Sequence, residues 1–222
     1  YGSISMNLFK KNNNEQIKAI RPKNFGWLEK KLSDKEMEYL WRCVDNRKGS
    51  HKRNLAGQIH ESNLLIDRGD WFWQNTLYPL CREYYEEFGN LGANVPVNQA
   101  HPYHLSSFWV NYQKQNEFNP NHDHQGVYSF VIWMKIPTKH FEQNKNPIAL
   151  KSNANLISSF AFTCLDTLGQ FSQYVYEMNP EMEGTMLFFP AKLQHCVYPF
   201  YNCDEDRISI SGNITLNTAR LL

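Results

Sequence analysis

Two histidines separated by one residue, His122 and His124, stand just before a long run of strand-forming side chains in the segment NPNHDHQGVYSFVIWMKIP. Because alternate residues of a β-strand face the same way, the two imidazoles can reach one point while Asp123 faces elsewhere. A third histidine, His195, follows the apolar stretch GTMLFFPA, and an antiparallel neighbour would bring it beside the first two. This spacing predicts a site for a divalent transition metal.

A second group of polar residues could bind an acid beside this centre. Arg207 stands twelve residues after His195, and Ser209 lies two residues further on, so an extended strand places both side chains on one face. A guanidinium binds a carboxylate through two parallel hydrogen bonds, and a nearby hydroxyl can add a third. Tyr112, ten residues before His122, could donate its phenol to the same acid.

The second half of the chain has the periodicity of β-strands that could position these residues. LSSFWVNYQ and RISISGNITLN alternate between apolar and polar side chains, whereas GVYSFVIWMKIP is apolar on nearly both faces, as suits a strand between two layers. Shorter strands are expected at LISSFAFTC, FSQYVYEM and GTMLFFPA. The pattern favours an antiparallel sandwich or barrel-like double sheet. We expect TKHFEQNKNPIALKSNAN to form a mobile loop over the site.

The first half predicts mainly helices. Ser33 and Glu36 have capping-box spacing ahead of one helix, and DWFWQNTLYPLCREYYEEFGN predicts a second, which Pro79 bends and Gly89 ends. A short strand is expected between the polar run KKNNNEQ and the turn RPKNFG. The expected fold class is α+β, mainly β, in a single domain over 1–222, with a helical support layer at 1–95 and a β core at 96–222.

Composition narrows the functional classes. The 23 Lys and Arg residues nearly cancel the 22 Asp and Glu residues, so no strong overall field attracts nucleic acid or an anionic membrane. Five widely spaced cysteines without a CxxC pair argue against a disulfide framework or a thiolate zinc site and favour a reducing cytosol. The sequence shows no signal peptide and no run of 18 apolar residues, so we expect a cytoplasmic protein without a membrane partner.

The order of Tyr, HxH, strand, distant His and Arg-x-Ser resembles the iron(II)- and 2-oxoglutarate-dependent dioxygenases. WVNYQKQNEFNPNHDHQGVYSFVIWMKIP and GTMLFFPAKLQHCVYPFYNCDEDRISISGNI are similar to a prolyl-hydroxylase-like branch of bacteria and their phages. The resemblance covers about residues 100 to 217, and LAGQIHESNLL extends it toward the N-terminal half. It implies a double-stranded β-helix (jelly-roll or cupin-like) core, and an oxygenase that uses Fe(II), 2-oxoglutarate and O2 and releases succinate and CO2.

The resemblance also implies roles for single residues. His122 would be the first iron ligand and His195 the distal ligand. The residues expected to bind 2-oxoglutarate are Arg207, Ser209, Tyr112, Asn111 and Asn213. The partners are then 2-oxoglutarate and a primary substrate that the sequence does not identify, whether peptidyl proline, another amino acid side chain or a small molecule.

The sequence departs from the family pattern at His124, where a carboxylate is usual. Three arrangements are open: His124 ligates and gives an all-histidine triad, Asp123 turns in through a bulge as the carboxylate ligand, or His124 is the first ligand with Gly126 at the carboxylate position. Three neutral imidazoles would leave Fe(II) with a net charge of +2, against +1 with one carboxylate. We favour ligation by His122 and His124, because it preserves the strand alternation.

Two functions from other classes are alternatives. The first is a cupin-like metal protein that does not use 2-oxoglutarate, and whose activity would not depend on Arg207. The second is a noncatalytic binding module that has kept the sandwich, in which His124 would mark a decayed site.

Overall fold

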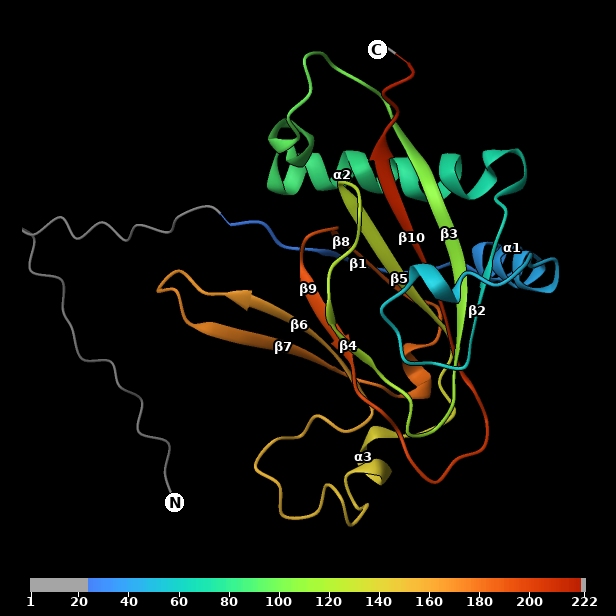
Figure 1. Ribbon diagram of the computed structural model, residues 1–222, viewed down its shortest axis with the longest axis vertical. Coiled ribbons are helices and arrows are strands. Elements are labelled where there is room, and N and C mark those ends of the chain that lie inside the picture. Colours follow the sequence, from blue (N-terminus) through green and yellow to red (C-terminus); the bar gives the residue numbers. More distant parts are fainter. Residues whose placement is uncertain (1–23, 221–222) are drawn as a thin grey trace, which may run out of the picture.

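A computed structural model describes residues 24–220 of the chain (Figure 1). Its strands form two antiparallel sheets. The larger sheet has the order β1-β8-β5-β10-β3-β2 and comprises β1 (Leu28–Lys31), β2 (Glu61–Leu64), β3 (Tyr103–Gln113), β5 (Tyr128–Lys135), β8 (Thr185–Pro190) and β10 (Arg207–Leu216). The smaller sheet has the order β4-β9-β6-β7 and comprises β4 (Asn119–His122), β6 (Ser159–Leu165), β7 (Phe171–Glu177) and β9 (Gln194–Val197).

From β3 to β10 the chain crosses repeatedly between the two sheets, with the β6–β7 hairpin as a consecutive pair in the small sheet, and this path makes the core a double-stranded β-helix. The expected mainly-β jelly roll is therefore confirmed. Apolar side chains on the facing sides of the two sheets form one hydrophobic cluster, which includes Trp133 and Phe189 of the large sheet and Phe160 and Phe162 of the small one. The β6–β7 hairpin projects from the body of the molecule (Figure 1).

Helices cover the other face of the large sheet (Figure 1). Helix α1 (Asp34–Asp45) begins with the expected capping box between Ser33 and Glu36. Helix α2 (Tyr78–Phe88) follows directly on the π-helical turn η3 (Trp73–Leu77). Pro79, near the start of α2, has no backbone N–H to donate to the preceding turn. Their apolar stripes pack with residues of β3, β5, β8 and β10 into a second cluster.

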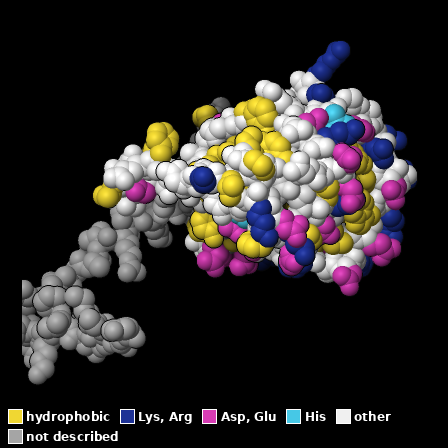
Figure 2. All heavy atoms as spheres, turned by 90° about the horizontal axis from the view of Figure 1, so that it is seen from below, with side chains coloured by type: hydrophobic (Ala, Val, Ile, Leu, Met, Phe, Trp, Pro, Cys, Tyr) yellow, Lys and Arg dark blue, Asp and Glu magenta, His cyan; other side chains and the backbone are white. Residues whose placement is uncertain are grey.

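The other helical segments are short. They are η1 (Lys52–Asn54), η2 (Arg68–Asp70), η4 (Leu91–Asn94), α3 (His140–Gln143) and η5 (Pro180–Met182). No helix among residues 24–220 is long and apolar enough to cross a membrane. On the face shown in Figure 2, acidic and basic side chains are interspersed, in keeping with the near balance of charges in the sequence.

The first half of the chain is less helical than its periodicity predicted. Strand β1 pairs with β8 and strand β2 pairs with β3, so this half supplies both edges of the large sheet. Each of the two strands has only four residues, too few for alternation to identify a strand. The short strand expected early in the chain lies in residues 1–23, outside the described residues.

Candidate metal centre and cosubstrate site

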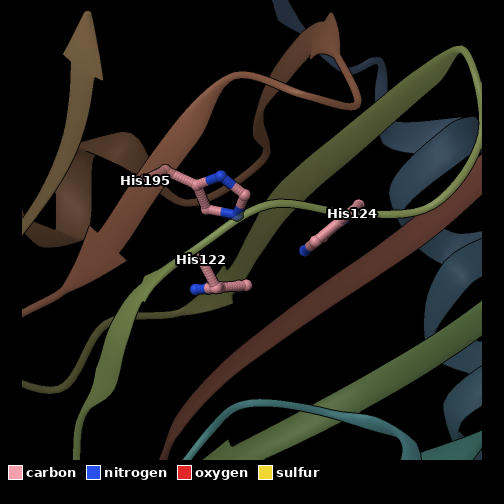
Figure 3. A group of neighbouring side chains, drawn as sticks. All are labelled: His122, His124 and His195. Carbon is pink, nitrogen blue, oxygen red and sulfur yellow. The ribbon is translucent and has the colours of Figure 1, made fainter.

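Three histidine side chains meet between the two sheets (Figure 3). His122, the last residue of β4, pairs directly with His195 of β9, and their ring centroids lie 4.3 Å apart. His124 follows in the turn to β5, with its ring centroid 5.3 Å from that of His122 and 4.8 Å from that of His195. One ring nitrogen from each residue lies within 4.8 Å of the other two. Three such ligand atoms can hold one metal ion.

The hydrogen bonds of His122 and His195 fix which nitrogen of each ring is free. Nδ1 of His122 lies 2.7 Å from the carbonyl oxygen of Pro120, and Nδ1 of His195 lies 2.9 Å from that of Leu193. A carbonyl oxygen only accepts, so each Nδ1 carries the proton and each Nε2 keeps its lone pair. In both cases the acceptor stands two residues before the histidine.

His124 forms its Nδ1 hydrogen bond with the hydroxyl of Ser129 on β5. The Ser129 hydroxyl donates to the carbonyl oxygen of Gly212, 2.8 Å away on β10. A hydroxyl has one proton to give, so its oxygen accepts from Nδ1 of His124. All three rings then present an unprotonated Nε2, the form in which neutral histidine binds a metal.

Burial keeps these imidazoles neutral. Desolvation lowers the pKa of His122 and lowers that of His195 well below its ordinary value. The pKa of His124 falls to about 3, first because of burial and second because of repulsion from His122. A low pKa favours the unprotonated imidazole that metal binding requires.

The arrangement also bears on the three alternatives for His124. The carboxylate of Asp123 faces Lys192, with Oδ1 3.4 Å from Nζ, and Gln194, with Oδ2 3.3 Å from Nε2. Asp123 does not join the group of ligand atoms. Gly126 forms the turn into β5 at a φ of +101°, and a Cβ there would lie 2.6 Å from the carbonyl oxygen of Ile214. This geometry favours the all-histidine arrangement.

A cavity of about 700 Å³ opens beside the three histidines. One wall comes from the large sheet through the inward side chains of β3 and β10, and another comes from β4, β6 and β9 of the small sheet. The segment before β2 closes a third side with His51, Asn54, Leu55, Ala56, Gly57 and Ile59. The volume is in the range of pockets that enclose small ligands.

Arg207 lies at the start of β10, facing the small sheet, and is 2% exposed. Its Nη2 donates to Oγ of Ser158 at 2.8 Å, and its Nη1 donates to Oε1 of Gln113 at 3.4 Å and to the carbonyl oxygen of Tyr198 at 3.3 Å. The ring of Phe200 stacks 4.8 Å from the guanidinium carbon. All three acceptors are neutral.

The guanidinium of Arg207 is incompletely satisfied. Its Nε is buried and has no hydrogen-bond partner, and no carboxylate pairs with the group among residues 24–220. Desolvation lowers its pKa to about 9, so the group stays charged at neutral pH. A buried charge without a counter-ion is costly, and an anionic ligand would offset that cost.

The structure brings four of the five expected cosubstrate residues to one face. Ser209, Asn111 and Asn213 line the cavity, and Arg207 lies on the same face of β10, two residues from Ser209. The side-chain oxygen Oδ1 of Asn111 accepts from Oγ of Ser62 at 2.8 Å, which fixes the orientation of the side-chain amide. The polar alternation of β3 and β10 thus faces inward.

Tyr112 is the exception and corrects the prediction. Adjacent strand residues point to opposite faces, so Tyr112 faces the helical side of the large sheet while Asn111 and Gln113 face inward. Its ring packs against the helix-side hydrophobic cluster, with the guanidinium carbon of Arg47 5.4 Å from its centroid. The prediction for Tyr112 used only its spacing of ten residues from His122 and did not consider which face of the strand the side chain occupies.

Several residues of the site were not predicted from sequence. Ser129 lies in the otherwise mostly apolar strand β5, and a single serine among apolar residues was the one sign in the sequence that this position has a polar role. Ser158 and Gln113 reach Arg207 only through the fold. The cavity wall at 51–59 also lacked a sequence signal. The segment at 138–155, expected to cover the site, contributes no side chain to the cavity lining.

Comparison with known proteins agrees with this geometry. Residues 107–213 match a family model described as "Putative 2OG-Fe(II) oxygenase". This segment contains all three histidines and runs from β3 through most of β10. No curated protein sequence matches the chain.

One solved structure shares the fold at low identity, and another is similar to a lesser degree. A prolyl-4-hydroxylase from Pseudomonas putida superposes with a TM-score of 0.50 and 14% identity, over 87% of this chain and 94% of that one. A viral collagen prolyl hydroxylase from Paramecium bursaria Chlorella virus-1 gives a TM-score of 0.46 and 14% identity, over 85% and 94% of the two chains. Over residues 107–213 the chain is therefore similar to the 2OG-Fe(II) oxygenases, and its three inward-facing histidines and buried arginine agree with that similarity.

Proposed function

We propose that this oxygenase binds iron(II) through Nε2 of His122, His124 and His195 and hydroxylates a substrate held in the adjoining cavity. One observation carries the assignment of residues. Three neutral imidazoles, each with its Nδ1 already bonded, converge between the same two sheets that bury an arginine which pairs with no carboxylate of the described residues.

The donor set fits a divalent metal. Imidazole nitrogens suit iron(II), zinc and their neighbours, and here the rings are neutral and oriented before any ion arrives. Three protein ligands would leave part of the coordination shell of the metal open, as a catalytic metal site requires. When bound, iron(II) with 2-oxoglutarate and O2 supplies the oxidising chemistry that yields succinate, CO2 and the hydroxylated product.

The residues around Arg207 fit the far carboxylate of 2-oxoglutarate. The guanidinium has an unused buried donor, and the hydroxyl of Ser209 faces the same way two residues along β10. Together they offer the charge-assisted hydrogen bonds that a carboxylate prefers. Ser158 and Gln113 hold the guanidinium in place, so binding does not have to order it.

The rest of the cavity would position the substrate and keep water out. Val131, Phe160 and Val197 give it an apolar side near the histidines. Asn111 gives it a polar side on β3, and Trp109 of the same strand adds an aromatic wall. The candidate acceptors for hydroxylation are a peptidyl proline, another amino acid side chain or a small molecule.

Anaerobic titration tests the assignment. Iron(II) is added to the metal-free protein, followed by 2-oxoglutarate, and the visible charge-transfer absorption of the chelate is recorded. We expect the band only when both are present, and we expect it to be lost in His195→Ala and weakened in Arg207→Met. Admission of air should then release succinate. A wild-type protein that binds iron(II) but shows neither band nor succinate would favour a cupin-like metal protein that does not use 2-oxoglutarate.

A further inference from the structure

We propose that Ser129 is a positioning residue for the metal centre, which holds His124 in the tautomer that exposes Nε2 to the metal. The inference rests on the proposed function, because it assumes that His124 is a ligand. It adds a residue for which neither the sequence pattern nor the family match gives a role.

His124 differs from the other two histidines in how its Nδ1 is held. His122 and His195 each donate to a backbone carbonyl two residues earlier, so their tautomer follows from the local backbone. His124 lies in the turn after β4 and bonds instead to a side chain on β5. Its tautomer therefore depends on side chains and not on the local backbone: the Ser129 hydroxyl is its bonded partner, and the Asn213 side chain also reaches the ring.

The proton of that hydroxyl is already committed. Oγ of Ser129 lies 2.8 Å from the Gly212 carbonyl oxygen and 3.4 Å from Oδ1 of Asn213, and either atom can accept it. Whichever does, the lone pairs of Oγ remain for Nδ1–H of His124. The opposite assignment, with Ser129 donating to Nδ1, would leave the Gly212 carbonyl without this donor and put a proton on Nε2 of His124. That proton would block the ligand position.

The serine is also fixed in space. It is fully buried and lies on β5 between two paired neighbours, Phe189 of β8 and Asn213 of β10. Its hydroxyl cannot turn out to solvent, and bulk water has no access to replace it. A rigid acceptor of this kind orients the imidazole before the metal binds, and such outer partners typically contribute about 10–100-fold in metal affinity.

Metal titration is the first test. Calorimetry with Co(II), without 2-oxoglutarate, compares wild type with Ser129→Ala and with Ser159→Ala. Ser159 is a matched control, because it is equally buried and donates to the Leu156 carbonyl without touching the three histidines. We expect Ser129→Ala to bind Co(II) about 10–100-fold more weakly and Ser159→Ala to bind it like wild type. Equal affinity in wild type and Ser129→Ala would overturn the inference.

The tautomer itself is the second test, and it needs no metal and no variant that folds. Long-range ¹H–¹⁵N spectra of the metal-free wild type at neutral pH should show the His124 proton on Nδ1 and a bare Nε2. A proton on Nε2 would overturn the role of Ser129 even if metal binds. A bare Nε2 in a protein that binds no Co(II) would leave Ser129 holding the tautomer and remove the proposed metal function instead.

Discussion

His122 and His195, 73 residues apart in the chain, are direct partners across the β4–β9 pair, with ring centroids 4.3 Å apart. Backbone hydrogen bonds between the two strands set this separation, so two of the three proposed ligands are fixed by the sheet itself. His124 is outside the ladder, in the turn that follows β4. The position of His124 therefore depends on single side chains, whereas the sheet fixes the positions of the other two histidines.

Replacing His124 should abolish tight metal binding, whereas replacing its neighbour should not. His124→Ala removes one of three converging nitrogens, so Co(II) affinity should fall by at least about 100-fold. Asp123→Ala removes a carboxylate that faces Lys192 and Gln194 and should change the affinity by less than about threefold. Calorimetry of the two variants decides between them. A larger loss in Asp123→Ala would indicate that the carboxylate is the ligand.

Arg207→Met should weaken the binding of 2-oxoglutarate without lowering the stability of the ligand-free protein. The methionine removes a buried charge that has no counter-ion within the part of the chain that the structure describes, so the ligand-free variant should be as stable as wild type or more so. It should lose the increase in melting temperature that 2-oxoglutarate gives the metal-loaded wild type. Thermal unfolding with and without 2-oxoglutarate measures both effects. A variant that 2-oxoglutarate still stabilises as it does wild type would show that the acid binds elsewhere.

Tyr112→Phe should leave cosubstrate binding unchanged, because the phenol lies on the helix side of β3. Ser209→Ala, on the inward face of β10, should weaken 2-oxoglutarate binding by about tenfold through the loss of one hydrogen bond to a charged group. The dissociation constants follow from titration of the anaerobic iron(II) complex. The reverse order of effects would restore the phenol as a cosubstrate ligand.

Stability of the metal-free protein should fall as pH drops from about 7 to about 5. Burial lowers the pKa values of His122, His124 and His195, so these rings stay neutral in the folded state while the unfolded chain takes up protons below about pH 6.5. The unfolded state then binds more protons, and each ring contributes at most about 1.4 kcal/mol per pH unit. Urea unfolding of His124→Gln should show a shallower slope than wild type. Equal slopes would contradict a neutral buried His124.

Glu36 should be a main support of the helical layer. Its carboxylate accepts hydrogen bonds from Ser33, Lys30 and Thr76. Burial opposes its ionisation, but these bonds outweigh that effect and lower its pKa to about 2. Glu36→Gln should therefore cost about 2 kcal/mol or more in the free energy of unfolding at neutral pH.

Glu38 on the same helix provides the matched control. It forms an exposed ion pair with Arg42, four residues along the helix. Glu38→Gln should cost no more than about 0.5 kcal/mol. Urea unfolding of both variants measures the difference, and comparable losses would show that the buried bonds of Glu36 contribute little.

The sequence was most informative where its pattern repeats. The alternation in β3 and β10 placed Ser209, Asn111 and Asn213 on one face, and the apolar stretch before His195 indicated the strand that leads to it. The capping box at Ser33 and the apolar stripe of α2 could also be predicted, because both are formed by residues close together in the sequence. Strands β1 and β2 were missed because four residues carry too little periodicity, and they form only by pairing with distant partners.

The residue types of the site and their order along the chain can be read directly from the sequence, and local periodicity assigns most of them to a strand face. The tertiary fold sets which side chains meet. It placed His124 and not Asp123 with the other two histidines, turned Tyr112 away, and brought the hydroxyl of Ser129 to Nδ1 of His124. These contacts depend on strand register and on the turn that Gly126 forms before β5. They join segments far apart in the chain, so the spacing of residues within any one segment does not predict them.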